Sequence, residues 1–513
     1  MDNNKELKWG SILSYIQLVI NIVVGVLYSP IMIRLLGQSE YGLYSTVAST
    51  ISMLSILSLG FNSSYVKYFA IYRKQNDVEK VYRLNGLFLI IFFIIGIVAL
   101  ACGLFLTTHL DLVFDKGLSN EEYDIAKILM LLLAINLSVS FPMSVFRTII
   151  SANERFIFLK ILGMLTTIIG PLVNLPLLLM GIRSIGLVVS SLVFSMVSDS
   201  ICIFYVVVRL KNKFIFKKVE KTLFKSLFSF TFFIALNMIV DEINNGLDRV
   251  LLGRYQGTIS VAIYSVGASL YAYYRNISIG VSGVFTTRVH QIYNAYDSSE
   301  ERDKELSILF IKVGRIQYLI LMLFASGIVF FGKQFIYFWV GEGYNDSYYV
   351  LLLLTIPATI PSIQNIGIEI QRAANKHQFR SIIYFFMALL NLILTINLCQ
   401  VYGAIGAVIG TCISILFANG IIMNIFYYKK LNINIPLFWK NIFRITLGMI
   451  PAFVIGFLIK SFIRFNNIGV MIMYIIIYTI IYFLCVRFFS MNMFEKNLIG
   501  SITSKFKKKK GVS

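Results

Sequence analysis

An arginine lies in the middle of an uncharged stretch of the chain, "SLYAYYRNISIGVSG" (269–283), where it can bind an anionic group. Arg254 and Arg288 are the nearest charged residues before and after Arg275. An arginine at the centre of a transmembrane helix costs roughly 2.5–3.5 kcal/mol on an insertion scale. Its guanidinium can repay that cost through charge-assisted, bidentate hydrogen bonds with an anion. We therefore expect Arg275 to have a function.

Polar and small residues recur at helical spacing around this arginine and in other apolar stretches. Such faces either line a cavity or mediate contacts between helices. For Arg275 the structural alternative is an ion pair with Asp241 or Asp248. On the helix face of Arg275 lie Tyr264, Ala268, Tyr271, Ser278 and Ser282. The preceding apolar stretch of the chain has a polar face with Asn237, Asp241, Asn244, Asn245 and Asp248. The first apolar stretch, near the N-terminus, has one with Gln17, Asn21, Gly25 and Tyr28.

The elements that must position these side chains are transmembrane helices. Of the 513 residues, 58% are hydrophobic and only 14% charged, against about 25% charged in soluble domains. Stretches of about 20 apolar residues can cross a ~30 Å hydrocarbon core, and only helices satisfy the backbone there. We predict an all-α polytopic membrane protein with about fourteen transmembrane helices, near 10–33, 42–65, 85–108, 124–147, 158–180, 184–208, 224–247, 259–284, 307–332, 348–371, 380–400, 403–428, 442–463 and 467–489.

The net charge of +21 is distributed as in a multi-pass membrane protein and does not indicate a nucleic-acid partner. Alternate connections, together with both termini, hold 36 of the lysines and arginines, and the other connections hold 9. The positive-inside rule then places both termini in the cytoplasm. The tail "KFKKKK" (505–510) indicates an anchor to anionic lipid. No connection is long enough for a soluble catalytic domain, and the five cysteines form no CxxC, so we expect no enzyme, metal or cofactor.

The chain repeats itself at an offset of about 220 residues. Three matches occur in the same order: 33–45 with 248–265, 151–162 with 373–384, and 184–192 with 404–412. They predict two parallel six-helix lobes around a central cavity, a plan suited to alternating access. The lobes span 1–213 and 214–430, and residues 431–513 add two helices and the polybasic cytoplasmic tail.

Three segments resemble the polysaccharide and oligosaccharide flippase family, the lipid-linked repeat-unit (O-antigen and capsule) type, within the multidrug/oligosaccharidyl-lipid/polysaccharide (MOP) exporter superfamily. They are "RLLGQSEYGLYS" (34–45), "SLGFNSSYVKYFAIYR" (58–73) and "SANERF" (151–156). The resemblance, which extends over essentially the whole chain, implies a flippase that moves undecaprenyl-diphosphate-linked glycan repeat units to the outer leaflet of the bacterial cytoplasmic membrane. Capsule or exopolysaccharide synthesis would use the product. The implied partners are that glycan, membrane lipids and, as a further candidate, a polysaccharide polymerase, with H⁺ or Na⁺ as the coupling ion.

The family has no invariant catalytic signature, so the site residues are argued from this sequence. We expect Arg275 to bind the diphosphate and polar side chains to bind the sugars. Three alternatives stay open: a cation-coupled multidrug exporter, a lipid II flippase, and a membrane glycan polymerase. The expected substrate-binding residues are Arg275, Tyr271, Ser278, Asn237, Asn245, Asp248 and Asn21.

Two further pairs of residues have predicted roles in the transport cycle. Asp241 and Asp199 are the candidate ion-coupling carboxylates, and Asp241 is preferred because a neutral residue, Asn419, occupies the repeat position of Asp199. Arg147 and Glu369 occupy equivalent places in the two repeats and have opposite charges, so they are candidates for a cytoplasmic gate. The alternative is that Arg147 only follows the positive-inside rule while Glu369 pairs locally with Arg372.

Overall fold

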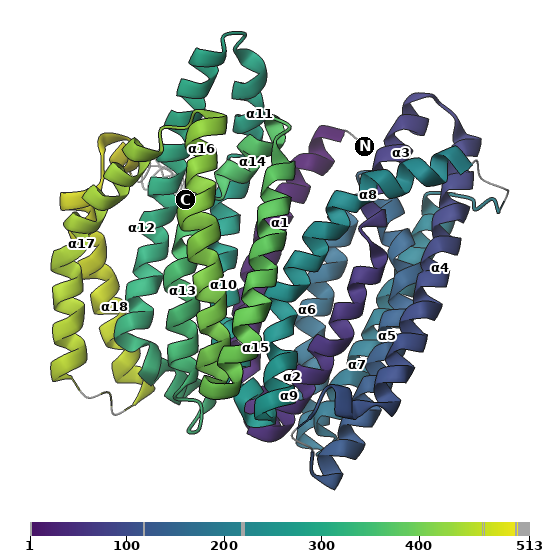
Figure 1. Ribbon diagram of the computed structural model, residues 1–513, viewed down its shortest axis with the longest axis horizontal. Helices are drawn as coiled ribbons and strands as arrows, with labels where there is room; N and C mark the ends of the chain where they lie inside the picture. The colour runs from purple at the N-terminus through teal and green to yellow at the C-terminus, as the bar shows by residue number, and fades with distance from the viewer. Residues whose placement is uncertain are drawn as a thin grey trace, which may run out of the picture. The chain divides into compact units, whose positions relative to one another are not determined.

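The computed structural model describes residues 3–115, 118–216, 221–463, 465, 467–497 and 500, and the regular elements among them are helices (Figure 1). The lysine-rich tail at 505–510 lies outside these residues. The chain forms two compact units, residues 1–266 with 381–411, and residues 267–380 with 412–513. The lobes expected from the repeat have other boundaries and stay a prediction.

In the first unit, α4 packs on α5, α5 on α7 and α1 on α6. Aromatic side chains fill much of its core; the rings of Tyr65 and Phe88 meet edge to face with centroids 5.2 Å apart. The elements are α1 (Asn3–Leu36), α2 (Gln38–Met53), η1 (Leu54–Ser58), α3 (Phe61–Lys74), α4 (Val78–Thr108), η2 (Leu110–Leu112), α5 (Asn120–Ala152), α6 (Phe156–Leu179), α7 (Arg183–Phe204), η3 (Tyr205–Arg209), α8 (Lys221–Glu242), η4 (Ile243–Leu247), α9 (Asp248–Gln256), the start of α10 (Thr258–Gly283) and much of α15 (His377–Ile415).

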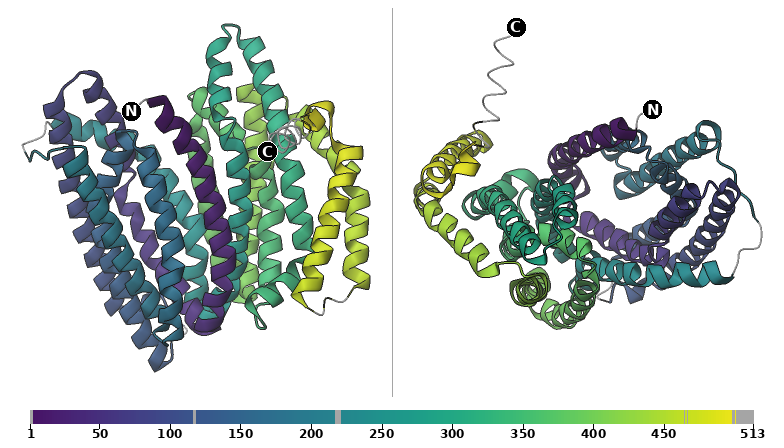
Figure 2. Two further views of the ribbon diagram at one scale, coloured as in Figure 1. Left: turned by 180° about the vertical axis from the view of Figure 1, so that it is seen from behind. Right: turned by 90° about the horizontal axis from the view of Figure 1, so that it is seen from above.

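The second unit is built on one long helix, α12, against which α13, α17 and α18 pack (Figure 2). Besides the rest of α10 and the two ends of α15, its elements are α11 (Thr286–Ala295), α12 (Ser299–Val340), α13 (Ser347–Ile363), α14 (Ile366–Ala373), η5 (Leu416–Ile422), α16 (Met423–Leu431), α17 (Ile435–Phe462), α18 (Ile468–Cys485) and η6 (Val486–Ser490).

Ten helices within the described residues are long and apolar enough to cross a membrane, or eleven if the pair α13 and α14, bent by 41°, counts as one span. A multi-pass, all-helical membrane protein is therefore confirmed, while the number fourteen stays a prediction. One predicted break between spans coincides with a break in the backbone: Gly403 has non-helical dihedrals (φ 57, ψ −135) inside the stretch His377–Leu431. The predicted spans near 224–247 and 259–284 correspond to α8 and α10, which are not among the ten.

Backbone conformations recur at positions that the repeat makes equivalent. Gly37 (φ 77, ψ 169) precedes α2, and Gly257 (φ 84, ψ 177) precedes α10. This conformation is open essentially to glycine alone. Arg183 and Gly403, which precede the aligned segments 184–192 and 404–412, also share a positive φ, 47° and 57°. The second half of the chain thus turns at the same places as the first.

A buried ion pair fixes the C-terminal helices of the second unit. Arg315 on α12 donates from Nε to Oε1 of Glu495 (2.7 Å) and from Nη2 to Oε2 (2.9 Å). It also donates to Oδ1 of Asn441 and to the carbonyl of Ser490. Both charged side chains are almost fully buried. Removing one partner would therefore leave an uncompensated buried charge.

We expect Glu495→Gln to lower the free energy of unfolding by about 3–5 kcal/mol, because Arg315 then stays buried without a counter-charge. Thermal unfolding of the purified protein in detergent measures the loss. The control is Glu79→Gln, which breaks the exposed Arg83–Glu79 pair and should cost less than about 1 kcal/mol. Equal effects of the two substitutions would contradict a stabilising role for the Arg315–Glu495 pair.

Candidate functional site

Arg275 lies on the helix that Gly257 opens, α10, and its side chain is exposed. The guanidinium carbon lies 6.0 Å from the ring centroid of Tyr271, one turn earlier, at the outer limit of a cation–π contact. Arg275 and Tyr271 therefore share a helix face, as their spacing predicts. The arrangement presents a positive charge next to an aromatic ring.

Ser278, one turn further along α10, is fully buried. Its hydroxyl donates to the carbonyl of Ser362 (2.6 Å) and accepts from Nδ2 of Asn365 (2.9 Å) and Nε2 of Gln317 (3.1 Å). These bonds tie α10 to α12 and to the end of α13, so the hydroxyl is occupied by protein groups. In this structure Ser278 is buried and joins helices, and its role as a substrate contact stays a prediction.

The polar face of α8, which continues into η4, presents three of the expected side chains. Asn237, Asp241 and Asn245 are exposed, at a spacing of four residues. Asn237 Nδ2 donates to the hydroxyl of Ser381 (3.0 Å), and Asn245 Nδ2 donates to the carbonyl of Asp241 (2.6 Å). Next to Asp241, Glu242 accepts a hydrogen bond from Ser55 (2.9 Å). The face can offer amides and a carboxylate to a ligand.

Asp248 is buried and does not belong to this face, and its role as a substrate contact stays a prediction. The segment Ile243–Leu247 is a π-helix, η4, whose wider turn rotates the following residues away from α-helical spacing. Asp248 is 1% exposed, and its Oδ2 accepts from the hydroxyls of Tyr264 (2.6 Å) and Thr411 (3.3 Å). Thr411 also donates to Oδ1 of Asn391 (3.3 Å). The result is a buried, oxygen-rich cluster.

Asn21 lies on α1. Its side chain is exposed, and its Oδ1 accepts a hydrogen bond from the hydroxyl of Thr167 on α6 (3.0 Å). One amide oxygen therefore helps to join two helices, while the exposed part of the side chain can still reach a ligand. Asn21 stays a predicted substrate contact.

Arg147 and Asp199, which were expected to serve in separate roles, form an ion pair. Nη2 of Arg147 on α5 lies 2.8 Å from Oδ1 of Asp199 on α7, and also donates to the hydroxyl of Ser198 (3.1 Å). The Asp199 side chain is 5% exposed and that of Arg147 47%. The carboxylate thus anchors a guanidinium that remains half accessible. The sequence does not predict this ion pair, because the two residues belong to different predicted spans.

Glu369 has a local partner. Its Oε1 lies 2.7 Å from Nη1 of Arg372, one turn later on α14. This is the local pair that the sequence offered as the alternative to a gate. A pairing of Glu369 with Arg147 during transport stays a prediction. Within the part of the chain that the structure describes, no group of three or more His, Cys, Asp or Glu side chains could hold a metal ion.

We expect Arg147→Met to cost about 1–3 kcal/mol of stability, because the buried Asp199 loses its charged partner. Adding Asp199→Asn should restore part of the loss, since no unpaired buried charge remains, and the two changes should be non-additive in thermal unfolding. Glu369→Gln is the control and should cost less than about 1 kcal/mol. Stronger coupling of Arg147 to Glu369 than to Asp199 would contradict this assignment and favour the gate.

Comparisons with known sequences give one family. The family model described as polysaccharide biosynthesis protein matches residues 7–287, more than half of the chain. A comparison with curated proteins finds no match. The matched range contains Arg275, Tyr271 and the polar face of α8.

Solved structures with the same fold are transporters. The lipid II flippase MurJ in an inward closed conformation is 17% identical, with a TM-score of 0.70 over 96% of this chain and 99% of that chain. Inward-facing and outward-facing multidrug resistance MATE family transporters of the MOP superfamily have TM-scores of 0.61 and 0.58. They are 14% and 15% identical and cover 82% and 84% of this chain, and 99% and 96% of their own chains. At these identities the likeness shows the fold.

Proposed function

Since the chain belongs to the polysaccharide biosynthesis protein family and has the fold of MurJ and the MATE transporters, we propose that it is a flippase for lipid-linked glycans. It is a multi-pass member of a transporter family and not an enzyme. The proposed cargo is an undecaprenyl-diphosphate-linked oligosaccharide repeat unit, moved from the cytoplasmic to the outer leaflet of the bacterial cytoplasmic membrane for capsule or exopolysaccharide synthesis. The family match, which includes Arg275, carries the proposal.

The chemistry of this cargo suits the exposed residues. A diphosphate has to cross a medium of low dielectric constant, where attraction to a fixed guanidinium is screened less than in water. Arg275 supplies that charge, and Tyr271 lies beside it. The amides of Asn237, Asn245 and Asn21 can hydrogen-bond to sugar hydroxyls, while the polyprenyl tail stays in the lipid.

Alternating access is the proposed mechanism. It uses two six-helix lobes followed by two further C-terminal helices and the cytoplasmic tail, with both termini in the cytoplasm. The three ordered sequence matches and the shared dihedral angles of Gly37 with Gly257 support this division. In such a plan, one repeat moves against the other around the substrate. A polysaccharide polymerase on the outer side would be the natural recipient of the product.

A lipid II flippase is the second candidate, because MurJ shares the fold over nearly the whole chain. Lipid II also carries a diphosphate, so the same arginine would serve either cargo. A multidrug cation exporter fits less well, since the positive charge of Arg275 repels cations, although Asp241 would suit one. The structure adds nothing that favours a glycan polymerase. The lipid-linked sugar that accumulates on the cytoplasmic face after gene deletion distinguishes the two flippases.

Coupling to H⁺ or Na⁺ has three candidate carboxylates in the first unit, two expected from the sequence and one added by the structure. Asp241 presents an exposed carboxylate on the polar face, whereas Asp199 is engaged by Arg147 and is therefore less suited. The structure adds the cluster around Asp248, where the oxygens of Tyr264, Thr411 and Asn391 surround a buried carboxylate. Oxygen atoms are the ligands that hard cations prefer.

We expect Arg275→Ala to abolish surface polymer while the protein still inserts in the membrane, because the diphosphate loses its counter-charge. Arg275→Lys should be intermediate, since lysine keeps the charge without the bidentate geometry. Surface polysaccharide and the lipid-linked precursor are measured in complemented deletion cells. Arg288→Ala, at an exposed position on α11, is the control and should export normally. Normal export of polysaccharide by the Arg275→Ala variant would show that Arg275 does not bind the diphosphate.

We expect Asp241→Asn to abolish the dependence of transport on pH or sodium if the exposed carboxylate carries the ion. Asp248→Asn should do so if the buried cluster carries it. Flipping by proteoliposomes under imposed proton or sodium gradients is the measurement, and Glu242→Gln, in the adjacent position, is the control. Unchanged ion dependence in both aspartate variants would show that neither carboxylate couples transport.

A further inference from the structure

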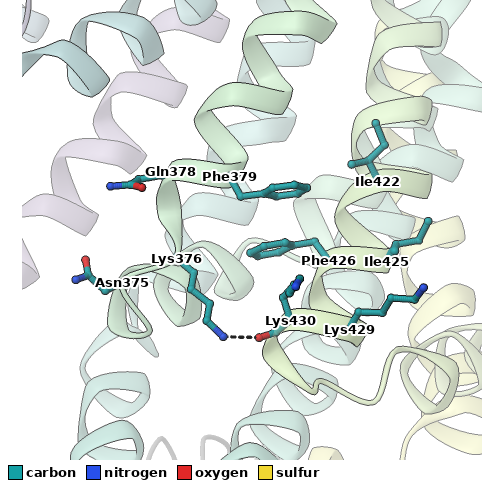
Figure 3. A pocket seen from close by; sticks show the side chains of 9 residues that line it. All are labelled: Asn375, Lys376, Gln378, Phe379, Ile422, Ile425, Phe426, Lys429 and Lys430. Atoms are coloured by element: carbon teal, nitrogen blue, oxygen red, sulfur yellow. Dashed lines mark hydrogen bonds between the residues drawn. The ribbon is translucent and has the colours of Figure 1, made fainter.

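A pocket of about 460 Å³ in the second unit lies between the start of α15 and the end of α16 (Figure 3). None of the residues considered above lines it. Three lysines, Lys376, Lys429 and Lys430, stand at its edge, and Phe379, Phe426 and Ile425 form its apolar wall. The pocket therefore joins a cluster of positive charge to an apolar surface.

The positive charge of this pocket is held in place. Nζ of Lys376 donates to the carbonyl of Lys430 (2.6 Å), as Figure 3 shows. That carbonyl lies in the last turn of α16, where it has no partner within the helix. The bond fixes the connection before α15 against the end of α16, and all three lysine side chains are exposed. Among the residues that the structure describes, no carboxylate forms an ion pair with any of them.

Stacked aromatic rings form part of the apolar wall. The rings of Phe379 and Phe426 stack with centroids 4.4 Å apart and planes only 6° from parallel (Figure 3). Ile425 is half exposed beside them, and exposed apolar side chains continue along the same segment at Ile421 and Phe417, each about half exposed. In a membrane-spanning protein, such a surface faces lipid chains. The apolar surface thus leads away from the lysines along the helix.

We propose that this pocket binds an anionic phospholipid of the surrounding bilayer, with its headgroup phosphate at the three lysines and an acyl chain along Ile425, Ile421 and Phe417. Charge complementarity selects the phosphate, and the adjoining apolar surface selects a lipid over a free anion. Basic pockets between transmembrane helices on the cytoplasmic side are suited to such headgroups, and the charge distribution predicts that side for both connections. The proposal does not depend on the glycan cargo.

The test is native mass spectrometry of the purified full-length protein titrated with dioleoyl phosphatidylglycerol in detergent. The triple variant Lys376→Gln, Lys429→Gln, Lys430→Gln should lose phosphatidylglycerol affinity roughly tenfold or more, because each lysine near an anionic group contributes to binding. The control removes the same charge from exposed lysines elsewhere, Lys74→Gln, Lys211→Gln, Lys304→Gln. It should bind as the wild type does.

Titrations with other ligands identify which part of the phospholipid is recognised. Phosphatidylcholine, inorganic phosphate and glycerol phosphate should bind much more weakly than phosphatidylglycerol, since the first lacks net charge and the others lack acyl chains. The single variant Lys429→Gln should show a smaller loss and serves if the triple variant does not fold. Unchanged phosphatidylglycerol binding in these variants would overturn the proposal. Equal binding of inorganic phosphate, or displacement by undecaprenyl phosphate at the same lysines, would overturn the assignment to bulk phospholipid.

Discussion

A polar group inside a bilayer has no water to bind, so each one needs a partner from the protein. Many buried polar side chains of the described spans have such a partner. Asn85 shows it well: its Oδ1 accepts from the Tyr65 hydroxyl (2.6 Å) while its Nδ2 donates to the carbonyl of Lys213 (3.0 Å). One side chain thereby satisfies a buried phenol and the irregular backbone that follows α7 and η3. The hydroxyl of Ser278 likewise satisfies polar groups of its neighbours and links α10 to α12 and to the end of α13.

The arginines in and beside the spans show two solutions to the same constraint. Arg315 and Arg147 each meet a buried carboxylate, and each thereby joins distant segments of its own unit. Arg147 stays half exposed while it is paired, and Arg275 is exposed with its guanidinium beside an aromatic ring. A charge that receives a ligand has to remain accessible. Accessibility therefore excludes the buried Arg315 as a binding residue and is met by Arg275 and Arg147.

The sequence predicts the helical class, most span positions and a break between spans next to Gly403, because hydropathy is a local property. It also predicts that Arg275 and Tyr271 share a face, since three and four residues separate neighbours on a helix. It does not predict the partners of buried polar groups, as Arg315 and Glu495 lie 180 positions apart. Nor does it reveal that Asp248 and Ser278 are buried, because that depends on the turn at η4 and on packing against other helices.

The π-helical turn at Ile243–Leu247 holds one residue more than an α-helical turn would need. Deleting a single residue there would restore α-helical geometry. The residues before the turn would then rotate by about 100° about the helix axis relative to those after it. Asn237 and Asp241 would then point in a new direction relative to Asp248, with no change in any side chain. Substitutions and small length changes are therefore not equivalent in this segment. Its length sets the orientation of one polar face against a buried cluster.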